Sequence, residues 1–265
     1  MAGFEAGCVL TPADYQLIAG AGLDYAEFSG RNVCAMEPGT FKELTHIVRD
    51  AGLPCRGFNA YCPPAVRIAG PGYSAVAARE YAKRCLERSA ELGVRVIGIG
   101  SPFSRNLPEG FDRKAAMRQA EEFFAVTAEV FSEQGIVICI EALGPCYCNF
   151  INRLEEAQPI VRAANMKNLK LVIDFYNMEH SGEADIPLEP FFQDVAHAHI
   201  SDDAGSPQKR WFLKPGKRDL HMSRLSRLFT LGYRGGVTLE IDLPANIKDA
   251  AQSVGILRDA FQTAV

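Results

Sequence analysis

Short apolar runs alternate with longer amphipathic stretches along the whole chain. A strand turns successive side chains to opposite faces, whereas a helix repeats its face every three or four residues. The strands expected on this basis are residues 6–10, 25–29, 56–61, 94–100, 136–143, 169–176, 195–201 and 236–241. The expected helices are about 12–20, 40–50, 74–92, 117–135, 154–164, 188–193, 222–231 and 247–261.

Strands that alternate with helices indicate βα units and a parallel sheet. Eight such units within 265 residues fit a closed barrel. An open, doubly wound sheet that holds a dinucleotide would need a glycine-rich turn after its first strand. Thr11 and Pro12 stand there instead, and this pair is typical of a helix start. We therefore predict a single (β/α)8 TIM barrel that forms one domain over residues 1–265.

Composition narrows the class of protein further. Apolar residues make up 48% of the chain, charged residues make up 23%, and the net charge is -4. This balance is typical of globular proteins and lacks the basic excess of a nucleic-acid-binding protein. No apolar run approaches the ~20 residues of a membrane span. The eight cysteines show no paired zinc-site spacing and no signal peptide precedes them, so we expect reduced thiols and a cytoplasmic protein.

Candidate chemistry lies at the carboxyl ends of the last four strands. Glu141 ends the fifth strand, Asp174 is near the end of the sixth, His199 is on the seventh, and Glu240 is on the eighth. Barrel enzymes build their sites at this end of the strands. One such carboxylate alone is commonly a cap, and one such histidine is commonly structural. Four on consecutive strands instead favour a shared divalent cation, which would relieve the repulsion between the carboxylates.

These residues resemble the xylose isomerase-like barrel superfamily of sugar phosphate isomerases and epimerases. The segments that carry the resemblance are Ile140-Glu141, Val172-Ile173-Asp174, His197-Ala198-His199-Ile200-Ser201 and Leu239-Glu240. The resemblance is nearest to the ketose 3-epimerase type. It implies that Glu141, Asp174, His199 and Glu240 bind one divalent metal ion, Mn²⁺ first and Co²⁺, Mg²⁺ or Zn²⁺ as alternatives. It also implies that Glu141 and Glu240 are the catalytic residues that remove and return a proton.

The remaining candidates are residues expected to contact the substrate. They are Glu27, Asn59, Arg105, Tyr147, Asn149, Asn177, His197 and Arg210. For His197 a structural role beneath the site is an equal alternative, and Asn59 has the alternative of binding loop backbone.

Three features depart from the epimerase pattern. Tyr147 stands where those enzymes carry a Glu, Asn177 stands where they carry a His, and the arginine expected soon after His199 is displaced to Arg210.

The function that follows is a metal-dependent isomerase or epimerase acting on a sugar or sugar phosphate through a metal-stabilised enediolate. The departures at Tyr147 and Asn177 keep a second function open, a metal-dependent lyase or dehydratase acting on a polyol or a sugar-derived keto acid. A non-catalytic binding protein and an apurinic endonuclease are further alternatives; the endonuclease would need more histidines and a basic face. The expected partner is a small carbohydrate, with no nucleic acid or membrane, and a homo-oligomer is open.

Overall fold

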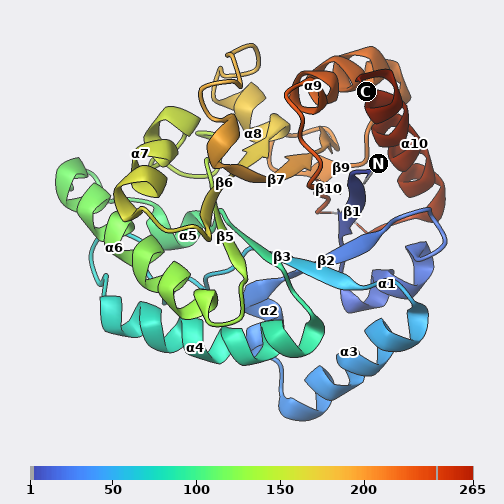
Figure 1. The fold of residues 1–265 in the computed structure, drawn as a ribbon. Coiled ribbons are helices and arrows are strands. Elements are labelled where there is room, and N and C mark those ends of the chain that lie inside the picture. The colour runs from blue at the N-terminus through green and yellow to red at the C-terminus, as the bar shows by residue number, and fades with distance from the viewer. Residues whose placement is uncertain (1–2, 243, 265) are drawn as a thin grey trace.

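Eight parallel strands close into a barrel, and helices form a ring around it (Figure 1). The computed structural model describes residues 3–242 and 244–264. The barrel strands are β1 (Glu5–Val9), β2 (Tyr25–Ser29), β3 (Cys55–Asn59), β4 (Val96–Ile99), β5 (Val137–Glu141), β6 (Leu169–Asp174), β7 (Val195–Ile200) and β10 (Gly236–Leu239). Neighbours in sequence are neighbours in space, and β10 pairs with β1 to close the sheet. The predicted barrel is confirmed.

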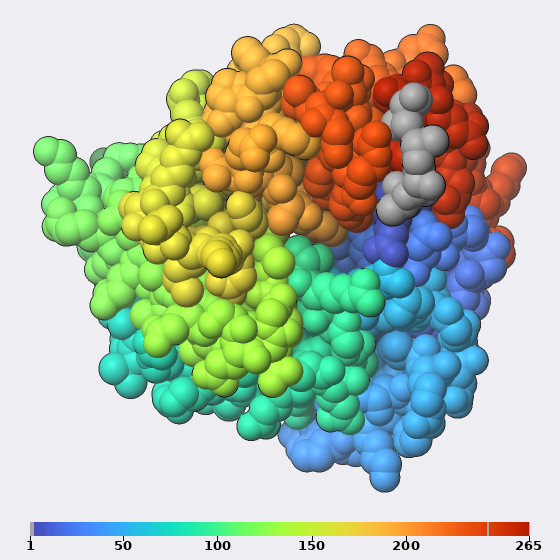
Figure 2. Space-filling model, viewed as in Figure 1, coloured from blue at the N-terminus to red at the C-terminus, as the bar shows by residue number. Residues whose placement is uncertain are grey.

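The helices connect these strands on the outside. The α-helices are α1 (Pro12–Ile18), α2 (Gly30–Ala35), α3 (Pro38–Ala51), α4 (Ala75–Leu92), α5 (Pro102–Arg105), α6 (Arg113–Ser132), α7 (Leu154–Ala164), α8 (Phe175–His180), α9 (Arg218–Thr230) and α10 (Ile247–Ala264). In space-filling view the chain follows the ring in order, from blue at the start to red at the end (Figure 2). No helix of the described residues is long and apolar enough to cross a membrane.

Helix α4 shows how local sequence sets an element of this ring. Ser74 caps its start, where the side chain accepts a hydrogen bond from the Ala77 amide at 3.2 Å. Gly93 ends it in the left-handed conformation, with φ of 77°, which a residue without Cβ adopts without strain. Its apolar face packs against α6. The alternation of polar and apolar positions therefore predicts both the helix and the face it buries.

Two expectations about secondary structure are wrong. Residues 188–191 form turns, and residues 192 and 193 belong to a short 3-10 helix, Phe192–Asp194. The sixth strand ends at Asp174 rather than at residue 176, because Asp174 caps α8: its Oδ1 accepts hydrogen bonds from the amides of Tyr176 and Asn177 at 2.8 and 3.2 Å. The short helices α2, α5 and α8 were not expected, since each lies in a loop too short for an apolar repeat.

An antiparallel hairpin interrupts the barrel pattern after β7. Its strands are β8 (Asp202–Asp203) and β9 (Arg210–Trp211), and they pair with each other rather than with the barrel. This hairpin was not predicted from the sequence. It determines where Arg210 lies, as described below.

All eight cysteines are free thiols.

Candidate metal centre

Four predicted donors converge at the carboxyl end of the barrel. Glu141 and Asp174 are the last residues of β5 and β6, His199 is the fifth residue of β7, and Glu240 directly follows β10. One ligand atom from each lies within 4.8 Å of the corresponding atoms of the other three. His199 is fully buried, and Glu141 and Asp174 are only 4% and 2% exposed. The convergence follows from parallel strands, whose carboxyl ends lie at one mouth of the barrel.

The contacts within this group are short. The Nδ1 atom of His199 lies 3.2 Å from Glu141 Oε1 and 3.3 Å from Glu240 Oε2. Asp174 turns Oδ2 toward the group, because its Oδ1 is used to cap α8. Glu240 Oε2 is buried and accepts no hydrogen bond of good geometry from the described residues. Its close neighbours are His199 Nδ1 and Arg210 Nη1, at 3.3 and 2.7 Å, so a bound cation would share this oxygen with Arg210.

The group fits a divalent cation. Metal–oxygen and metal–nitrogen bonds of about 2.0–2.2 Å place opposite ligand atoms up to about 4.4 Å apart. The four ligand atoms lie within 4.8 Å of one another, so only small shifts would bring them around one ion. Three carboxylates and one imidazole form a donor set that suits Mn²⁺, Co²⁺, Zn²⁺ or Mg²⁺. One shared cation at these four residues is compatible with this arrangement and stays a prediction.

Arg210 reaches the same place from the β8–β9 hairpin. Its Nη1 lies 2.9 Å from Asp174 Oδ2 and 2.7 Å from Glu240 Oε2. Its guanidinium carbon lies 4.8 Å from the ring centre of Tyr176 and 5.6 Å from that of Tyr147. Arg210 lies later in the sequence than the arginine of the epimerases, but the hairpin places its guanidinium at the site.

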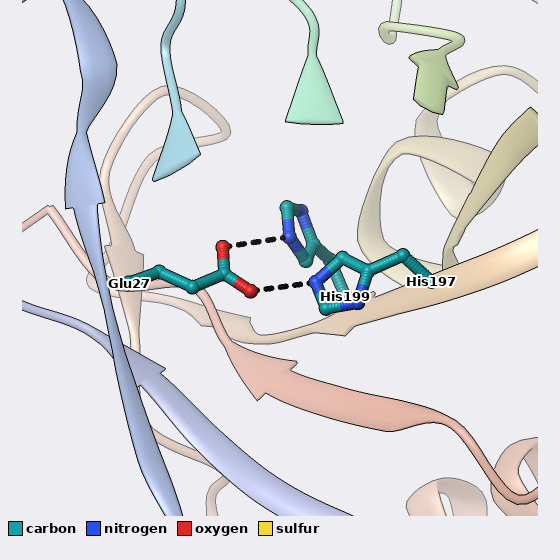
Figure 3. A group of neighbouring side chains, drawn as sticks. All are labelled: Glu27, His197 and His199. Carbon is teal, nitrogen blue, oxygen red and sulfur yellow. Dashed lines mark hydrogen bonds and ion pairs between the residues drawn. The ribbon is translucent and has the colours of Figure 1, made fainter. Parts of the chain in front are cut away.

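A buried carboxylate lies on the inner side of His199, deeper in the barrel (Figure 3). Glu27 of β2 points between two imidazoles: its Oε1 is 2.6 Å from His197 Nε2, and its Oε2 is 3.3 Å from His199 Nε2. Thr238 donates a further hydrogen bond to Glu27 Oε1 at 2.5 Å. Since Nε2 of His199 faces Glu27, its Nδ1 is turned toward the carboxylates at the mouth. A carboxylate that holds the second nitrogen of a ligand histidine is a common support for metal sites.

The electrostatics of the group reflect this crowding. Burial and the neighbouring charge of Glu240 raise the pKa of Glu141 to about 7. Burial alone would raise the pKa of Asp174, but Arg210 and His199 outweigh it and lower that pKa. Burial would lower the pKa of His199, but the charge of Glu27 and bonds to Glu141 and Glu240 hold it well above its usual value. The site therefore balances acidic and basic groups that are largely buried.

A cavity of about 450 Å³ opens above the donors. Glu141, Glu240, Tyr147 and Arg210 line it. The other residues of its wall are Arg31, Ala60, Gly100, Ser101, Pro102, Phe103, Leu143, Cys146, Gln208 and Asp242. Its volume suits a small molecule such as a sugar.

Two predicted substrate contacts, Tyr147 and Arg210, thus lie on the cavity wall. Two others bind the donors themselves. Asn177 donates to Asp174 Oδ2 at 2.6 Å and to Glu141 Oε1 at 3.3 Å, and Asn59 donates to Glu240 Oε1 at 3.4 Å. These amides hold the carboxylates in place.

The structure places the remaining four away from the cavity wall. Glu27 and His197 lie deeper in the barrel, which matches the structural alternative for His197. Arg105 is fully buried and donates to the Glu141 carbonyl at 2.8 Å. Asn149 joins two loops through paired hydrogen bonds with the backbone of Leu107. Strand alternation predicts the face of a side chain but not its depth, and loop residues have no such rule.

Glycines that the sequence reasoning missed make room for the donors. A Cβ on Gly100 would lie 2.4 Å from Glu141 Oε2, and one on Gly57 would lie 2.6 Å from Cγ of Glu27. Ala60 and Ser101, both on the cavity wall, have φ of 44° and 49°, which is unusual for residues with a side chain. A glycine inside a strand pattern is a usable signal, since it often marks close approach of another group.

The fold and the site together define a (β/α)8 barrel with a candidate metal centre at the carboxyl ends of its strands. The family model described as xylose isomerase-like TIM barrel matches residues 15–260. The chain belongs to this family. No curated protein matches it significantly in sequence.

Solved structures share the fold at low sequence identity. An L-ribulose 3-epimerase has a TM-score of 0.78 at 17% identity, with 98% of this chain and 95% of that chain covered. The 3-keto-D-glucoside 4-epimerase from E. coli has a TM-score of 0.74 at 18% identity, covering 97% and 99%. An AP endonuclease of family 2 from Brucella melitensis has a TM-score of 0.69 at 21% identity, covering 94% and 96%.

Proposed function

We propose that the protein is a metal-dependent isomerase or epimerase that acts on a small carbohydrate or its phosphate. The observation that carries this proposal is the convergence of Glu141, Asp174, His199 and Glu240 within 4.8 Å at the floor of a cavity. Similarity to the L-ribulose and 3-keto-D-glucoside epimerases supports the choice of substrate class.

The four donors would hold one divalent ion, Mn²⁺ being our first choice. When bound, the ion would supply positive charge to substrate oxygens as negative charge develops during proton removal. Glu27 would keep His199 in the orientation and tautomer in which Nδ1 is free to bind the ion.

Glu141 and Glu240 are the proposed proton carriers. Both line the cavity, and each has an oxygen close to Nδ1 of His199, at 3.2 and 3.3 Å. A carbon held between them, next to a carbonyl group, would lose its proton to one carboxylate and regain a proton from the other. Return of the proton to the opposite face inverts the carbon, and return to the neighbouring carbon moves the carbonyl.

Arg210 and Tyr147 would orient the substrate. Asp174 and Glu240 bind one side of the Arg210 guanidinium, and the rings of Tyr147 and Tyr176 hold its plane. Its position at the cavity wall allows a charge-assisted hydrogen bond to a substrate oxygen. Burial raises the pKa of Tyr147, although Arg210 opposes this, so the phenol keeps its proton at neutral pH.

A metal-dependent lyase or dehydratase is the second candidate, and Tyr147 favours it. A protonated phenol on the cavity wall is a suitable acid for a departing hydroxyl group. The same carboxylates would remove the proton from the neighbouring carbon. The two candidates differ in whether water leaves the substrate.

Metal analysis of the purified protein, followed by incubation with ketoses, keto acids and inositols in deuterated water, tests both candidates. We expect about one equivalent of divalent metal and deuterium incorporation into a ketose with an isomeric product. Loss of water from the substrate would instead establish the lyase. Absence of both metal and exchange across the panel would reject a catalytic function.

A further inference from the structure

A second cavity lies at the opposite, amino-terminal mouth of the barrel. Its volume is about 210 Å³. The strands are parallel, so residues near their starts gather here, far along the strands from the metal centre. The wall residues are Glu5, Tyr25, Arg56, Arg95, Val96, Val137, Ala196, His197 and Gly236. None of the four proposed metal ligands is among these wall residues.

Two arginines make its wall positively charged. Arg56 is on β3, and Arg95 directly precedes β4. The Arg95 amide donates to the Arg56 carbonyl at 2.8 Å, which fixes the two residues beside each other on adjacent strands. Like charges in this arrangement repel. Burial and then the charge of Arg95 lower the pKa of Arg56, consistent with two guanidinium groups in mutual range.

The wall contains too little negative charge to neutralise both arginines. Glu5 forms an ion pair with Arg56. Arg95 is exposed and has no ion pair or side-chain hydrogen bond to any described residue. One guanidinium therefore remains available at the edge of a cavity that already holds a second.

The remaining polar groups of the wall are turned into the barrel or left free. Tyr25 is hydrogen bonded to Thr238 at 2.6 Å, and His197 uses Nε2 for Glu27. Nδ1 of His197 has no hydrogen bond to a residue that the structure describes, although His197 is only 2% exposed. This unpartnered nitrogen belongs to a residue of the cavity wall and is not fully buried, so a polar occupant of the cavity has access to it.

We propose that the amino-terminal mouth binds a small tetrahedral oxyanion, either inorganic phosphate or the phosphate group of a small metabolite, between Arg56 and Arg95. Guanidinium groups bind phosphate oxygens in pairs, so two of them recognise one anion well. A water molecule takes about 30 Å³ of liquid volume, so the cavity has room for the anion and part of its hydration. The anion removes the repulsion between the two arginines.

Calorimetric titration of the whole protein with inorganic phosphate, at constant ionic strength, tests this site. We expect saturable binding of one equivalent that weakens at least tenfold in Arg95→Gln. Arg95 is exposed, so this variant should fold, and its melting curve checks that. Arg118→Gln, an exposed arginine on α6, is the matched control and should bind within twofold of the unchanged protein. Parallel titration with glycerol phosphate shows which source is preferred, and tighter binding of either probe supports the site.

A second control separates the two cavities. Arg31 lines the cavity above the metal centre, so Arg31→Gln should leave phosphate binding unchanged. Ring resonances of His197 should shift on titration, whereas those of exposed His46 should not. Binding that survives Arg95→Gln, binding lost only in Arg31→Gln, or no saturable binding at all would overturn the proposal. None of these results depends on the proposed isomerase activity.

Discussion

The first half of the barrel wall, strands β1 to β4, and the second half, strands β5, β6, β7 and β10, contribute differently to the metal centre. Strands β5, β6, β7 and β10 carry or lead into all four proposed ligands. In the first half, Gly57 of β3 leaves room for Glu27 on the adjacent strand β2, and Gly100, directly after β4, leaves room for Glu141 on the adjacent strand β5. A barrel of this size is normally filled by side chains, so a bulky group on one strand requires a small residue on its neighbour.

Glu27 of β2 is the exception in the first half. It brings a buried charge toward His197 and His199, and those two imidazoles lower its pKa against the opposing effect of burial. The second half thus carries the proposed ligands, while the first half contributes one buried carboxylate and the glycines beside Glu27 and Glu141.

The strongest way to break this arrangement is to neutralise a donor of the second half. Glu240→Gln keeps the size of the side chain and removes its charge. We expect turnover to fall by roughly 10²- to 10⁴-fold, the range for loss of a proton-transfer group, with the fold retained. Steady-state kinetics and circular dichroism measure this. Glu133→Gln, at an exposed position, is the control. Unchanged turnover in Glu240→Gln would reject its catalytic role.

The next largest loss of turnover should come from adding a methyl group at Gly100, beside Glu141. Gly100→Ala places a methyl group 2.4 Å from Glu141 Oε2, so the carboxylate must move. Misplacement of a reacting group by about 1 Å costs up to roughly 10²-fold in rate. Gly39→Ala is a matched control, because nothing lies within 4 Å of its added Cβ. If both variants turn over substrate equally, the glycine does not serve Glu141.

Glu27→Gln tests whether the Glu27 carboxylate supports the metal ligand His199. The amide retains the shape of the side chain but loses the charge that faces both imidazoles. Loss of such a support typically weakens metal affinity by about 10- to 100-fold. Mn²⁺ titration followed by electron paramagnetic resonance measures the affinity. Glu122→Gln, at an exposed position where the carboxylate accepts a hydrogen bond from Tyr73, should leave it unchanged. Equal affinity in Glu27→Gln and the unchanged protein would contradict the supporting role.

The smallest effect is expected from Asp202, which holds the β8–β9 hairpin that carries Arg210. Asp202, at the base of the hairpin, binds His221, Lys217 and the Lys214 amide at 2.8, 2.8 and 2.7 Å. Burial opposes ionisation of Asp202, but these partners outweigh it and lower its pKa below the usual value. Its stabilisation is therefore complete above the unfolded pKa of about 3.9 and is lost as the pH falls through the folded pKa.

We expect Asp202→Asn to lower the unfolding free energy by about 1.5–3 kcal/mol at pH 7, the range for hydrogen bonds to charged groups. The difference from the unchanged protein should shrink as the pH falls toward 3. Urea unfolding at several pH values measures both quantities. Asp50→Asn, which removes an exposed ion pair with Arg49, serves as the control. A difference that is constant with pH would show that the charge of Asp202 does not matter.

The repeat of apolar runs was sufficient to predict the eight strands, because each is a local segment with a local pattern. Strand direction then placed Glu141, Asp174 and His199 at one mouth, since parallel strands share one carboxyl end. Helix α8 was missed because Asp174 both ends a strand and caps a helix, and the apolar residues that follow look like more strand.

Side-chain alternation and strand direction are rules of local geometry, so the barrel and the convergence of the four donors could be predicted from the residues alone. The depth of each side chain and the course of the loops became visible only in the folded chain. The tertiary structure placed His197 below the site, buried Arg105 against the Glu141 carbonyl, and returned Arg210 to the donors through a hairpin. The physical reason is that depth and loop course depend on contacts between residues far apart in the chain, which no local pattern records.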